Sequence, residues 1–261
     1  MAYVRSNAMS VGTRHDHTLR LLENRGEVTV AELSHVLTVS EMTIRRDLES
    51  LERQGLLRRV HGGAISAISR GYEPPYGLRA GRAMEAKVRI ARMAASLVAE
   101  GEAMVIDVGT TALELARALS SRMGLTILTP SFRAAELLMP NPDLRVIVTG
   151  GIVRPGELSL VGDLAERAFS DLHCDVVYLG AGGVDATVGV TEFNLDDARV
   201  KRAALASARR CVVLADSSKL DRVAVASVCP VDRVDVLITD EDAPEEVLAR
   251  LRERDVEVLV A

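Results

Sequence analysis

Two adjacent arginines, Arg45 and Arg46, lie in the stretch SEMTIRRDLE at residues 40–49 of a chain that is acidic overall, with 32 Lys and Arg against 37 Asp and Glu. Guanidinium groups hold phosphates and read guanine through paired hydrogen bonds, which is the chemistry of DNA recognition. The alternative is a solvated helix in which ion pairs with Glu41 and Glu49, four residues away, neutralise Arg45. For the arginines alone, the sequence favours that alternative.

The residues around the arginines predict two helices joined by a tight turn. Thr29 and Glu32 match a capping box at the start of the first helix, and Ser40 is a preferred N-cap for the second. The apolar positions expected to face a core are Val30, Leu33, Val36 and Leu37 in the first helix and Ile44, Leu48 and Leu51 in the second. Arg45 and Arg46 then project outward, as in a helix-turn-helix whose second helix enters the DNA major groove.

A β-hairpin is expected after the arginine helix, which Gly55 ends, because LLRRVHGGA at residues 56–64 alternates apolar and polar positions. Its glycines would let this wing approach the sugar-phosphate backbone of DNA closely. A further short helix is expected earlier, at residues 15–25. The residues assigned to DNA contact are Ser40, Met42, Thr43, Arg45, Arg46, Arg58, Arg59, His61, Gly62 and Gly63.

A second group of residues with binding chemistry lies in loops that follow apolar runs. IDVGTT at residues 106–111 places a glycine and two threonines at a helix start, where backbone N–H groups and the helix dipole attract anions. The loop lacks the GK[ST] of ATP-binding loops, so nucleotide hydrolysis is not expected. Taken singly, such loops have structural explanations, with Asp107 as a helix cap and Asp216 as the brace of a turn. Arg154 would similarly pair with Glu157.

Beyond residue 83, short β-rich runs alternate with helical stretches, which predicts an α/β domain with a mainly parallel sheet covered on both faces. The expected buried strands span residues 103–109, 125–130, 144–151, 174–183, 210–218 and 234–240. The expected helices span residues 84–98, 111–121, 131–138, 195–208 and 244–253. Since open α/β sheets bind ligands at the carboxyl ends of their strands, the loops should together form one anion pocket.

Composition sets the domain boundaries. Residues 1–8, MAYVRSNA, resemble the remnant of a cleaved tag, with an upstream native start as the alternative. A DNA-binding domain at 9–66, a linker containing Pro and Gly at 67–83 and an α/β domain at 84–261 are expected.

No apolar run in the sequence approaches the roughly 18 residues of a membrane helix. Three widely spaced cysteines without a metal-ligand pattern fit reduced thiols, so a cytoplasmic protein without metal or cofactor is expected.

Residues 28–64, VTVAELSHVLTVSEMTIRRDLESLERQGLLRRVHGGA, closely resemble the N-terminal signature of the DeoR family of bacterial transcriptional regulators. Both the TIRRDL core and the RVHGGA wing of that signature are present. The resemblance implies an α-rich winged helix-turn-helix domain in which Arg45 and Arg46 contact operator DNA. It also fits a native start at Met9.

The second part of the chain resembles the sensor domain of the same family, so the resemblance covers nearly all of residues 11–258. It implies a fold similar to ribose-phosphate isomerases and coenzyme A transferases, and a phosphorylated sugar as effector. The ligand-binding residues carried over by position are Asp107, Gly109, Thr110, Thr111, Ser131, Gly150, Gly151, Arg154, Lys201, Asp216 and Lys219. One departure is Pro130, which replaces the asparagine of the family's TNS motif and removes an amide from the pocket.

The chain has only three lysines, Lys87, Lys201 and Lys219, whereas it has many arginines. A lysine retained in such a chain is a candidate for a position where the planar fork of arginine will not serve, with chance retention as the alternative. Two of the three lie at the expected pocket. Lys87 matches a lysine that opens the family's sensor domain, which implies a structural role.

The resemblance implies a transcriptional regulator, a repressor of a carbohydrate-utilisation operon, that binds double-stranded operator DNA as a homo-oligomer and responds to a phosphorylated sugar or polyol. An alternative is a sugar-phosphate isomerase-like enzyme that uses Asp185, Glu192 and Lys201 as acid–base groups. A third reading is a DNA-binding protein whose sensor domain has lost its ligand. The complete DNA-reading segment favours the regulator over the enzyme.

Overall fold

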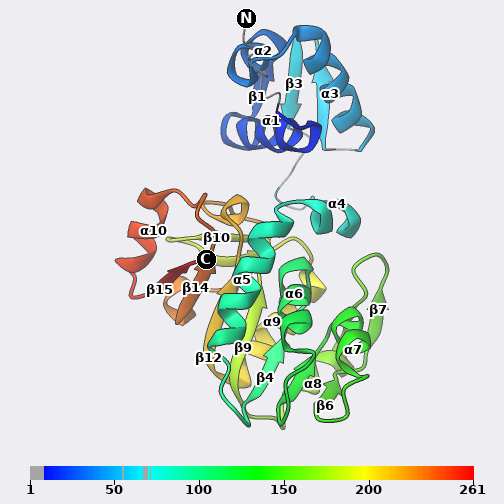
Figure 1. The fold of residues 1–261 in the computed structure, drawn as a ribbon, viewed down its shortest axis with the longest axis vertical. Coiled ribbons are helices and arrows are strands. Elements are labelled where there is room, and N and C mark those ends of the chain that lie inside the picture. Colours follow the sequence, from blue (N-terminus) through cyan, green and yellow to red (C-terminus); the bar gives the residue numbers. More distant parts are fainter. Residues whose placement is uncertain (1–8, 55, 67–69, 71) are drawn as a thin grey trace, which may run out of the picture. The chain divides into compact units, whose positions relative to one another are not determined.

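A computed structural model describes residues 9–54, 56–66, 70 and 72–261 of the chain. The chain forms two compact units, divided between Tyr72 and Glu73 (Figure 1). The expected tag at residues 1–8, the expected helix end at Gly55 and part of the expected linker lie outside the described residues.

The N-terminal unit is a winged helix-turn-helix, as the sequence predicts. Its elements are α1 (Val11–Arg25), β1 (Glu27–Thr29), α2 (Val30–Leu37), α3 (Glu41–Arg53), β2 (Leu57–Val60) and β3 (Gly63–Ser66). The predicted hairpin is β2–β3 and forms the wing. The short strand β1, which the sequence pattern does not predict, pairs with β3 and gives the antiparallel order β1-β3-β2.

Side-chain caps set where these helices begin. Ser10, Thr29 and Ser40 each accept a hydrogen bond from the backbone N–H three residues further on, so both predicted N-caps are confirmed. Because Ser10 caps α1, that helix begins at Val11 rather than at the predicted His15.

The apolar stripes of α2 and α3 form the core of this unit with one exception. Ile44, Leu48 and Leu51 are buried, as predicted. The prediction for Val36 is wrong, because its side chain is 50% exposed. Helix α2 is short, and Val36 lies outside the narrow stripe that packs on the core.

A buried ion pair joins α1 to the inner face of α3. Arg14 donates from Nε to Asp47 Oδ2 at 2.8 Å and from Nη2 to Oδ1 at 3.1 Å. His15 Nε2 lies 3.3 Å from the same Oδ1. Two charged residues on amphipathic helices give no sequence signal of such a pairing, so it was not predicted.

The C-terminal unit is built on a sheet of seven parallel strands in the order β15-β14-β12-β9-β4-β5-β6. Its strands are β4 (Ala103–Ile106), β5 (Thr126–Thr129), β6 (Arg145–Val148), β9 (Cys174–Gly180), β12 (Ala208–Leu214), β14 (Val236–Thr239) and β15 (Glu257–Val260). All six predicted strands are confirmed, and β15 was not expected. Strand β6 is partly exposed rather than buried, because it lies at an edge of this sheet.

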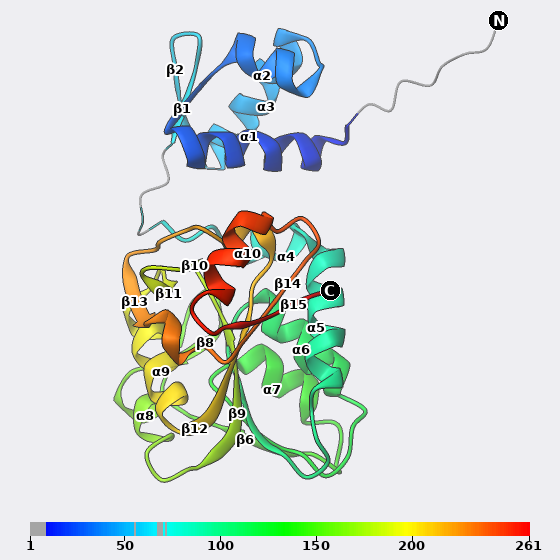
Figure 2. The same cartoon turned by 90° about the vertical axis from the view of Figure 1, so that its left-hand side faces the viewer.

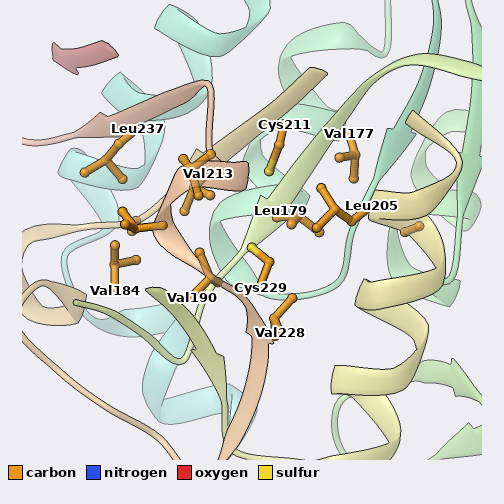
Figure 3. Close-up of a cluster of buried hydrophobic side chains, with 14 of the residues drawn as sticks. Val177, Leu179, Val184, Val190, Leu205, Cys211, Val213, Val228, Cys229 and Leu237 are labelled. Carbon is orange, nitrogen blue, oxygen red and sulfur yellow. The ribbon is translucent and has the colours of Figure 1, made fainter. Parts of the chain in front are cut away.

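Helices cover both faces of the sheet, as predicted (Figure 2). The helices are α4 (Tyr76–Gly81), α5 (Met84–Ser96), α6 (Thr110–Leu119), α7 (Phe132–Leu138), α8 (Asp163–Arg167), α9 (Leu195–Ala206) and α10 (Glu245–Arg252). One face, which includes Ile106 and Tyr178, packs on α5, α6 and α7. The other face, which includes Leu179 and Val213, packs on α8, α9 and α10 (Figure 3). No helix among the described residues offers an apolar stretch that could span a membrane.

Short elements between the main strands were not predicted. They are the antiparallel pair β7 (Ile152–Arg154) and β8 (Ser159–Val161), the small sheet of β10 (Gly183–Asp185), β11 (Gly189–Glu192) and β13 (Ala226–Cys229), and the 3-10 turns η1 (Ser217–Lys219) and η2 (Val231–Arg233). They are three or four residues long, so neither a strand nor a helix period can develop in the sequence.

The expected linker at residues 67–83 requires correction in its second half. The residues from Glu73 onward belong to the C-terminal unit, and α4 forms within them. The tandem prolines that suggested a linker precede this helix instead, where the fixed φ of proline is compatible with a helix start.

Candidate functional site

Helix α3 presents the predicted DNA-reading side chains away from the core. Arg45 and Arg46 are exposed, Met42 is 57% exposed, and Thr43 is half-buried. Arg45 Nη2 lies 2.8 Å from Glu41 Oε2, so one ion pair of the solvated-helix alternative is present. An exposed pair of this kind contributes only about 0.2–0.5 kcal/mol, so a DNA phosphate can replace the glutamate.

The wing carries exposed polar groups, but one of its glycines serves packing. The exposed wing residues among those predicted are Arg58, Arg59, His61 and Gly62. Gly63 is buried, and a Cβ built on it would lie 2.1 Å from the carbonyl oxygen of Val28. Strand β3 therefore approaches β1 too closely for any side chain at this position. Gly62 has a φ of 82°, which glycine adopts without strain at the tip of the hairpin.

The parallel sheet brings the predicted pocket loops to a common edge. Strands β12, β9, β4, β5 and β6 are neighbours in that order, so their carboxyl ends adjoin. The residues at or just after these ends are Asp216, Gly180, Asp107, Ser131 and Gly150, respectively. Charged side chains from helices and turns join them there and form two clusters.

The first cluster surrounds Lys201 on α9, whose side chain is almost fully buried. Its ammonium contacts the Asp107 carboxylate and the carbonyl oxygen of Gly180, the latter at 2.9 Å. Glu192 Oε2 lies 3.3 Å from the same nitrogen. Burial disfavours the ammonium, but the two carboxylates outweigh it and raise the pKa of Lys201. The ammonium thus donates two hydrogen bonds within the unit and forms ion pairs with two buried carboxylates.

Asp107 does not cap the helix that follows it. Its Oδ2 accepts the backbone N–H of Gly180 at 2.8 Å as well as the Lys201 ammonium. A Cβ on Gly180 would lie 2.8 Å from the carbonyl oxygen of Val108, so the two strand ends pack tightly. The Asp107 carboxylate thus fixes the relative position of β4, β9 and α9.

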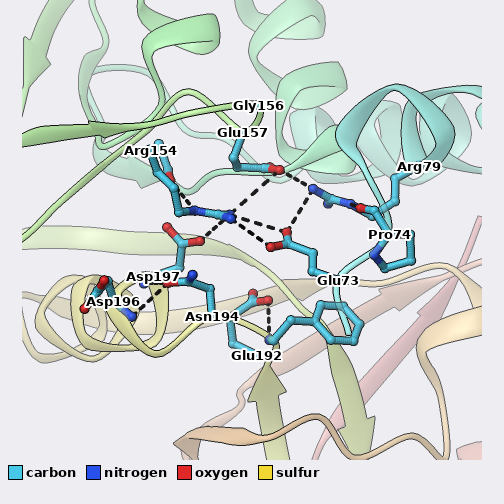
Figure 4. Close-up of polar contacts among 12 residues, drawn as sticks. Glu73, Pro74, Arg79, Arg154, Gly156, Glu157, Glu192, Asn194, Asp196 and Asp197 are labelled. Carbon is cyan, nitrogen blue, oxygen red and sulfur yellow. Dashed lines mark hydrogen bonds and ion pairs between the residues drawn. The ribbon is translucent and has the colours of Figure 1, made fainter. Parts of the chain in front are cut away.

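The second cluster, which we name the arginine cluster, contains Glu73, Arg79, Arg154, Glu157 and Asp197 (Figure 4). Arg154 Nη1 lies 2.8 Å from Glu73 Oε2, and its Nη2 lies 2.5 Å from Asp197 Oδ2. Glu157, the partner expected from the sequence, is 3.9 Å from Arg154. Arg79 pairs with Glu73 at 3.0 Å and also with Glu157. Two guanidinium groups therefore face three carboxylates.

Lys219 has a different environment. Its ammonium lies 5.4 Å from the centre of the Phe193 ring, on which the Arg222 guanidinium also lies. Within the described part of the chain, this ammonium has no hydrogen-bond or ion-pair partner. Burial lowers the pKa of Lys219, although the nearby Asp216 carboxylate opposes the shift. Asp216 braces its turn as expected, since its carboxylate accepts from the backbone and side chain of Ser218.

Helix α6 begins without a side-chain cap. Its N-cap is Gly109, with a φ of 109°, and Thr110 and Thr111 form its first turn. Nothing lies within 4 Å of a Cβ built on Gly109, so there is open space beside this residue, whereas the side chains of Thr110 and Thr111 are buried. Backbone N–H groups that point into open space at a helix start are an anion-binding geometry.

The remaining predicted residues have structural roles. Ser131 caps α7 by accepting a hydrogen bond from Ala134 N at 3.2 Å. A Cβ on Gly151 would lie 2.6 Å from the Val161 carbonyl oxygen, so this glycine allows β7 to pack closely on β8. Gly150 has a φ of 73° and open space at its Cβ position.

The acid–base groups of the enzyme alternative are not held as one group. Glu192 contacts Lys201, but Asp185 accepts hydrogen bonds from the backbone N–H groups of Thr187 and Val188, both at 2.8 Å. The Asp185 carboxylate therefore orders the turn between β10 and β11.

Sequence reasoning missed Glu73, Arg79, Phe193 and Asp197. The first two lie in a segment that was taken for a linker. The other two lie in TEFNLDD, residues 191–197, which run from the end of β11 into the first turn of α9, and a polar segment at a helix start was the signal that could have found them. Asn194 in that segment caps α9 through bonds from two backbone N–H groups, and so orients Asp197.

A winged helix-turn-helix followed by an α/β unit with open strand-end loops defines a DNA-binding transcriptional regulator with its own sensor domain. Two family descriptions match the chain: the DeoR-like helix-turn-helix domain over residues 14–70 and the DeoR C terminal sensor domain over residues 82–241. The chain belongs to the DeoR family of transcriptional regulators, which confirms the resemblance seen in the sequence.

Named relatives match the chain over almost their whole length. The HTH-type transcriptional regulator GolR of Listeria innocua is 33% identical, with 95% of this chain and 98% of the relative covered. The glycerol-3-phosphate regulon repressor of Escherichia coli K12 is also 33% identical, over 94% of this chain and 97% of the relative. Among solved structures, ribose 5-phosphate isomerase A of Methanocaldococcus jannaschii is similar at 21% identity, with a TM-score of 0.40 over 52% of this chain and 54% of the other.

Proposed function

We propose that this regulator represses a carbohydrate-utilisation operon and that a phosphorylated sugar or polyol controls it by binding the α/β unit. Relatives named as a glycerol-3-phosphate regulon repressor and a putative aga operon transcriptional repressor, both from Escherichia coli, support this class of effector. The observation that carries the proposal is the uncapped start of α6, with open space beside Gly109, at a sheet edge that also bears the half-buried Lys219, for which the described residues provide no ion-pair partner.

The effector's phosphate would lie at the start of α6. The backbone N–H groups and hydroxyls of Thr110 and Thr111 can donate hydrogen bonds to phosphate oxygens, and the helix dipole favours negative charge there. The positive φ of Gly109 turns the chain into the helix while leaving the space above it open. The predicted D-x-G-T-T loop therefore has a donor-rich end, Thr110 and Thr111, and a structural end, Asp107.

Lys219 and Arg154 would supply the cations. Burial lowers the pKa of Lys219, and an adjacent phosphate dianion favours its charged form, so the lysine and the ligand stabilise each other. Arg154 offers a planar fork that fits phosphate oxygens once a carboxylate leaves it. Lys201 is almost fully buried and already paired with two carboxylates, so we assign it the role of holding Asp107 and Glu192 in place.

Control of DNA binding requires that the effector bind the DNA-competent and incompetent forms with different affinities. We propose that the regulator reads DNA as a symmetric homo-oligomer, because one helix-turn-helix covers only a short half-site. Footprinting should then reveal repeated half-sites separated by whole helical turns. A single short footprint together with a monomer in sedimentation would exclude this arrangement.

The effector class can be tested with the full-length chain and a panel of aldose, ketose and polyol phosphates, each paired with its unphosphorylated form. Thermal-shift screening followed by calorimetry should find binding of a phosphate ester and not of the free sugar, and gel shifts should show release of operator DNA. Equal affinity for both forms would remove the phosphate site. A turnover assay on the same panel separates the regulator from the enzyme alternative, since the regulator should return its ligand unchanged.

A further inference from the structure

Residues Glu73–Arg82, which we name the strap, bury only one of their residues, Pro74, and contact the α/β unit through several ion pairs. Helix α4, which forms most of the strap, contains no buried residue. The strap instead contributes Glu73 and Arg79 to the arginine cluster, where they meet Arg154 and Glu157. A segment docked in this way can be released by an ion that competes for its partners.

Two further residues, Arg133 and Lys87, contact the rest of the strap. The guanidinium of Arg133 lies 4.0 Å from the centre of the Tyr76 ring. Buried Lys87 on α5 donates hydrogen bonds to the carbonyl oxygens of Arg79 and Arg82, the latter at 2.6 Å. These contacts anchor the end of the strap next to α5, whereas the end at Glu73 depends on the arginine cluster.

The charge balance of the arginine cluster does not accommodate a further anion. Its three carboxylates already outnumber its two guanidinium groups, and burial raises the pKa of both Glu157 and Asp197. A phosphate bound to Arg154 would add more negative charge unless a carboxylate left. Glu157 and Asp197 are buried within the unit, on the β7–β8 turn and on α9, so Glu73 is the carboxylate that can leave.

We propose that the Glu73 carboxylate occupies the position on Arg154 that the effector's anionic group takes, so that effector binding and docking of the strap exclude each other. The inference rests on the phosphate site proposed above. It reaches the DNA-binding unit through covalent continuity, because Glu73 follows Tyr72 directly. The hydroxyl of Tyr72 donates to the carbonyl oxygen of Gln54, the C-cap of α3, at 3.4 Å. Release of the strap thus frees the chain next to a residue bound to the end of the recognition helix.

The test compares full-length parent and Glu73→Gln, which keeps the side-chain shape and loses its charge. Inorganic phosphate and glycerol 3-phosphate serve as probes in calorimetry. Because strap docking lowers the fraction of chains in which Arg154 is available, the variant should bind the probes about fivefold more tightly. Amide exchange in residues 73–82 should rise in the parent on adding a probe and be raised in the variant without one. Glu246→Gln, an exposed glutamate on α10, is the matched control and should behave as the parent.

Asp197→Asn separates displacement from a general charge effect. Asp197 also contacts Arg154 but lies on α9, so this change should tighten probe binding without raising exchange in the strap of the free protein. Parent-like exchange in unliganded Glu73→Gln, or unchanged exchange when a probe binds the parent, would overturn the inference. If neither probe binds any variant, the phosphate site fails, and the exchange of free Glu73→Gln still decides whether its carboxylate holds the strap.

Discussion

Lys201 and Lys219 were assigned to the same pocket from the sequence, yet their surroundings differ completely. Lys201 is almost fully buried, and its ammonium contacts two carboxylates and a carbonyl oxygen. Lys219 lies against an aromatic ring, and the described residues provide its ammonium with no anionic partner. A lysine that is paired with carboxylates of the protein fixes the position of those groups, whereas a lysine without such a partner remains available to a ligand.

The largest expected effect is the loss of stability on replacing Lys201. Lys201→Met leaves Asp107 and Glu192 buried without a cation, and breaking a buried pair in this way typically costs about 3–5 kcal/mol. Urea unfolding followed by circular dichroism should show a correspondingly less stable α/β unit. Adding Asp107→Asn should recover part of the loss, since one unpaired charge is then removed. A single variant as stable as the parent would show that Lys201 is not a structural cation.

Lys219→Met should have the opposite profile. The fold should remain stable, because no described carboxylate loses its partner, while effector binding loses a charge-assisted hydrogen bond worth about 1.5–3 kcal/mol. That corresponds to a loss in affinity of tenfold or more, as measured by calorimetry. Operator binding without effector should persist, which would make the variant non-inducible. Arg209→Met, an exposed cation of the same unit, is the control. Equal effector affinity in parent and Lys219→Met would show that Lys219 does not contact the effector.

Two arginines on the recognition helix α3 also differ in whether the protein pairs them with a carboxylate. Arg45 is paired with Glu41, while Arg46 is exposed and enters no ion pair within the described part of the chain. Replacing a base-reading arginine with alanine should weaken operator binding by about 1–3 kcal/mol and relax specificity at one base pair. Arg46→Ala should cost more than Arg45→Ala, because Arg45 must first give up its glutamate. Gel shifts over a range of salt concentrations test this, with exposed Arg53→Ala as the control. Parent-like binding by both variants would remove α3 from the interface.

The smallest effect concerns the third lysine. Burial lowers the pKa of Lys87 to about 8, below its ordinary value, so the folded chain releases this proton before the unfolded chain does. Below about pH 8 the charged, buried Lys87 therefore destabilises the folded state. This destabilisation decreases as the pH rises, by about 1 kcal/mol between pH 8 and 9. The unfolding free energy of the parent relative to Lys87→Met should rise by that amount over this interval. A flat difference would mean that Lys87 titrates normally.

The sequence predicts the winged helix-turn-helix and the main sheet because their signals are local. A few consecutive residues are enough to recognise helix caps such as Thr29 and Ser40 and strands such as β9 and β12. The roles of pocket residues depend instead on contacts between distant segments. The Lys201–Asp107 pair spans 94 positions and the Arg154–Glu73 pair spans 81, and no periodicity or motif spacing encodes either. Position alone placed Lys201 and Lys219 together, and only their neighbours distinguish them.

The ion pair between Arg14 and Asp47 fixes the roll of the recognition helix about its own axis. An apolar stripe alone tolerates a rotation of several degrees, because hydrophobic contact is not directional. A two-pronged guanidinium–carboxylate contact is directional and loses one of its bonds when the helix turns. Asp47 directly follows Arg46, so the roll that it fixes also sets the direction in which Arg45 and Arg46 leave the helix. A residue on the inner face of α3 thereby sets the orientation of the side chains on its outer face.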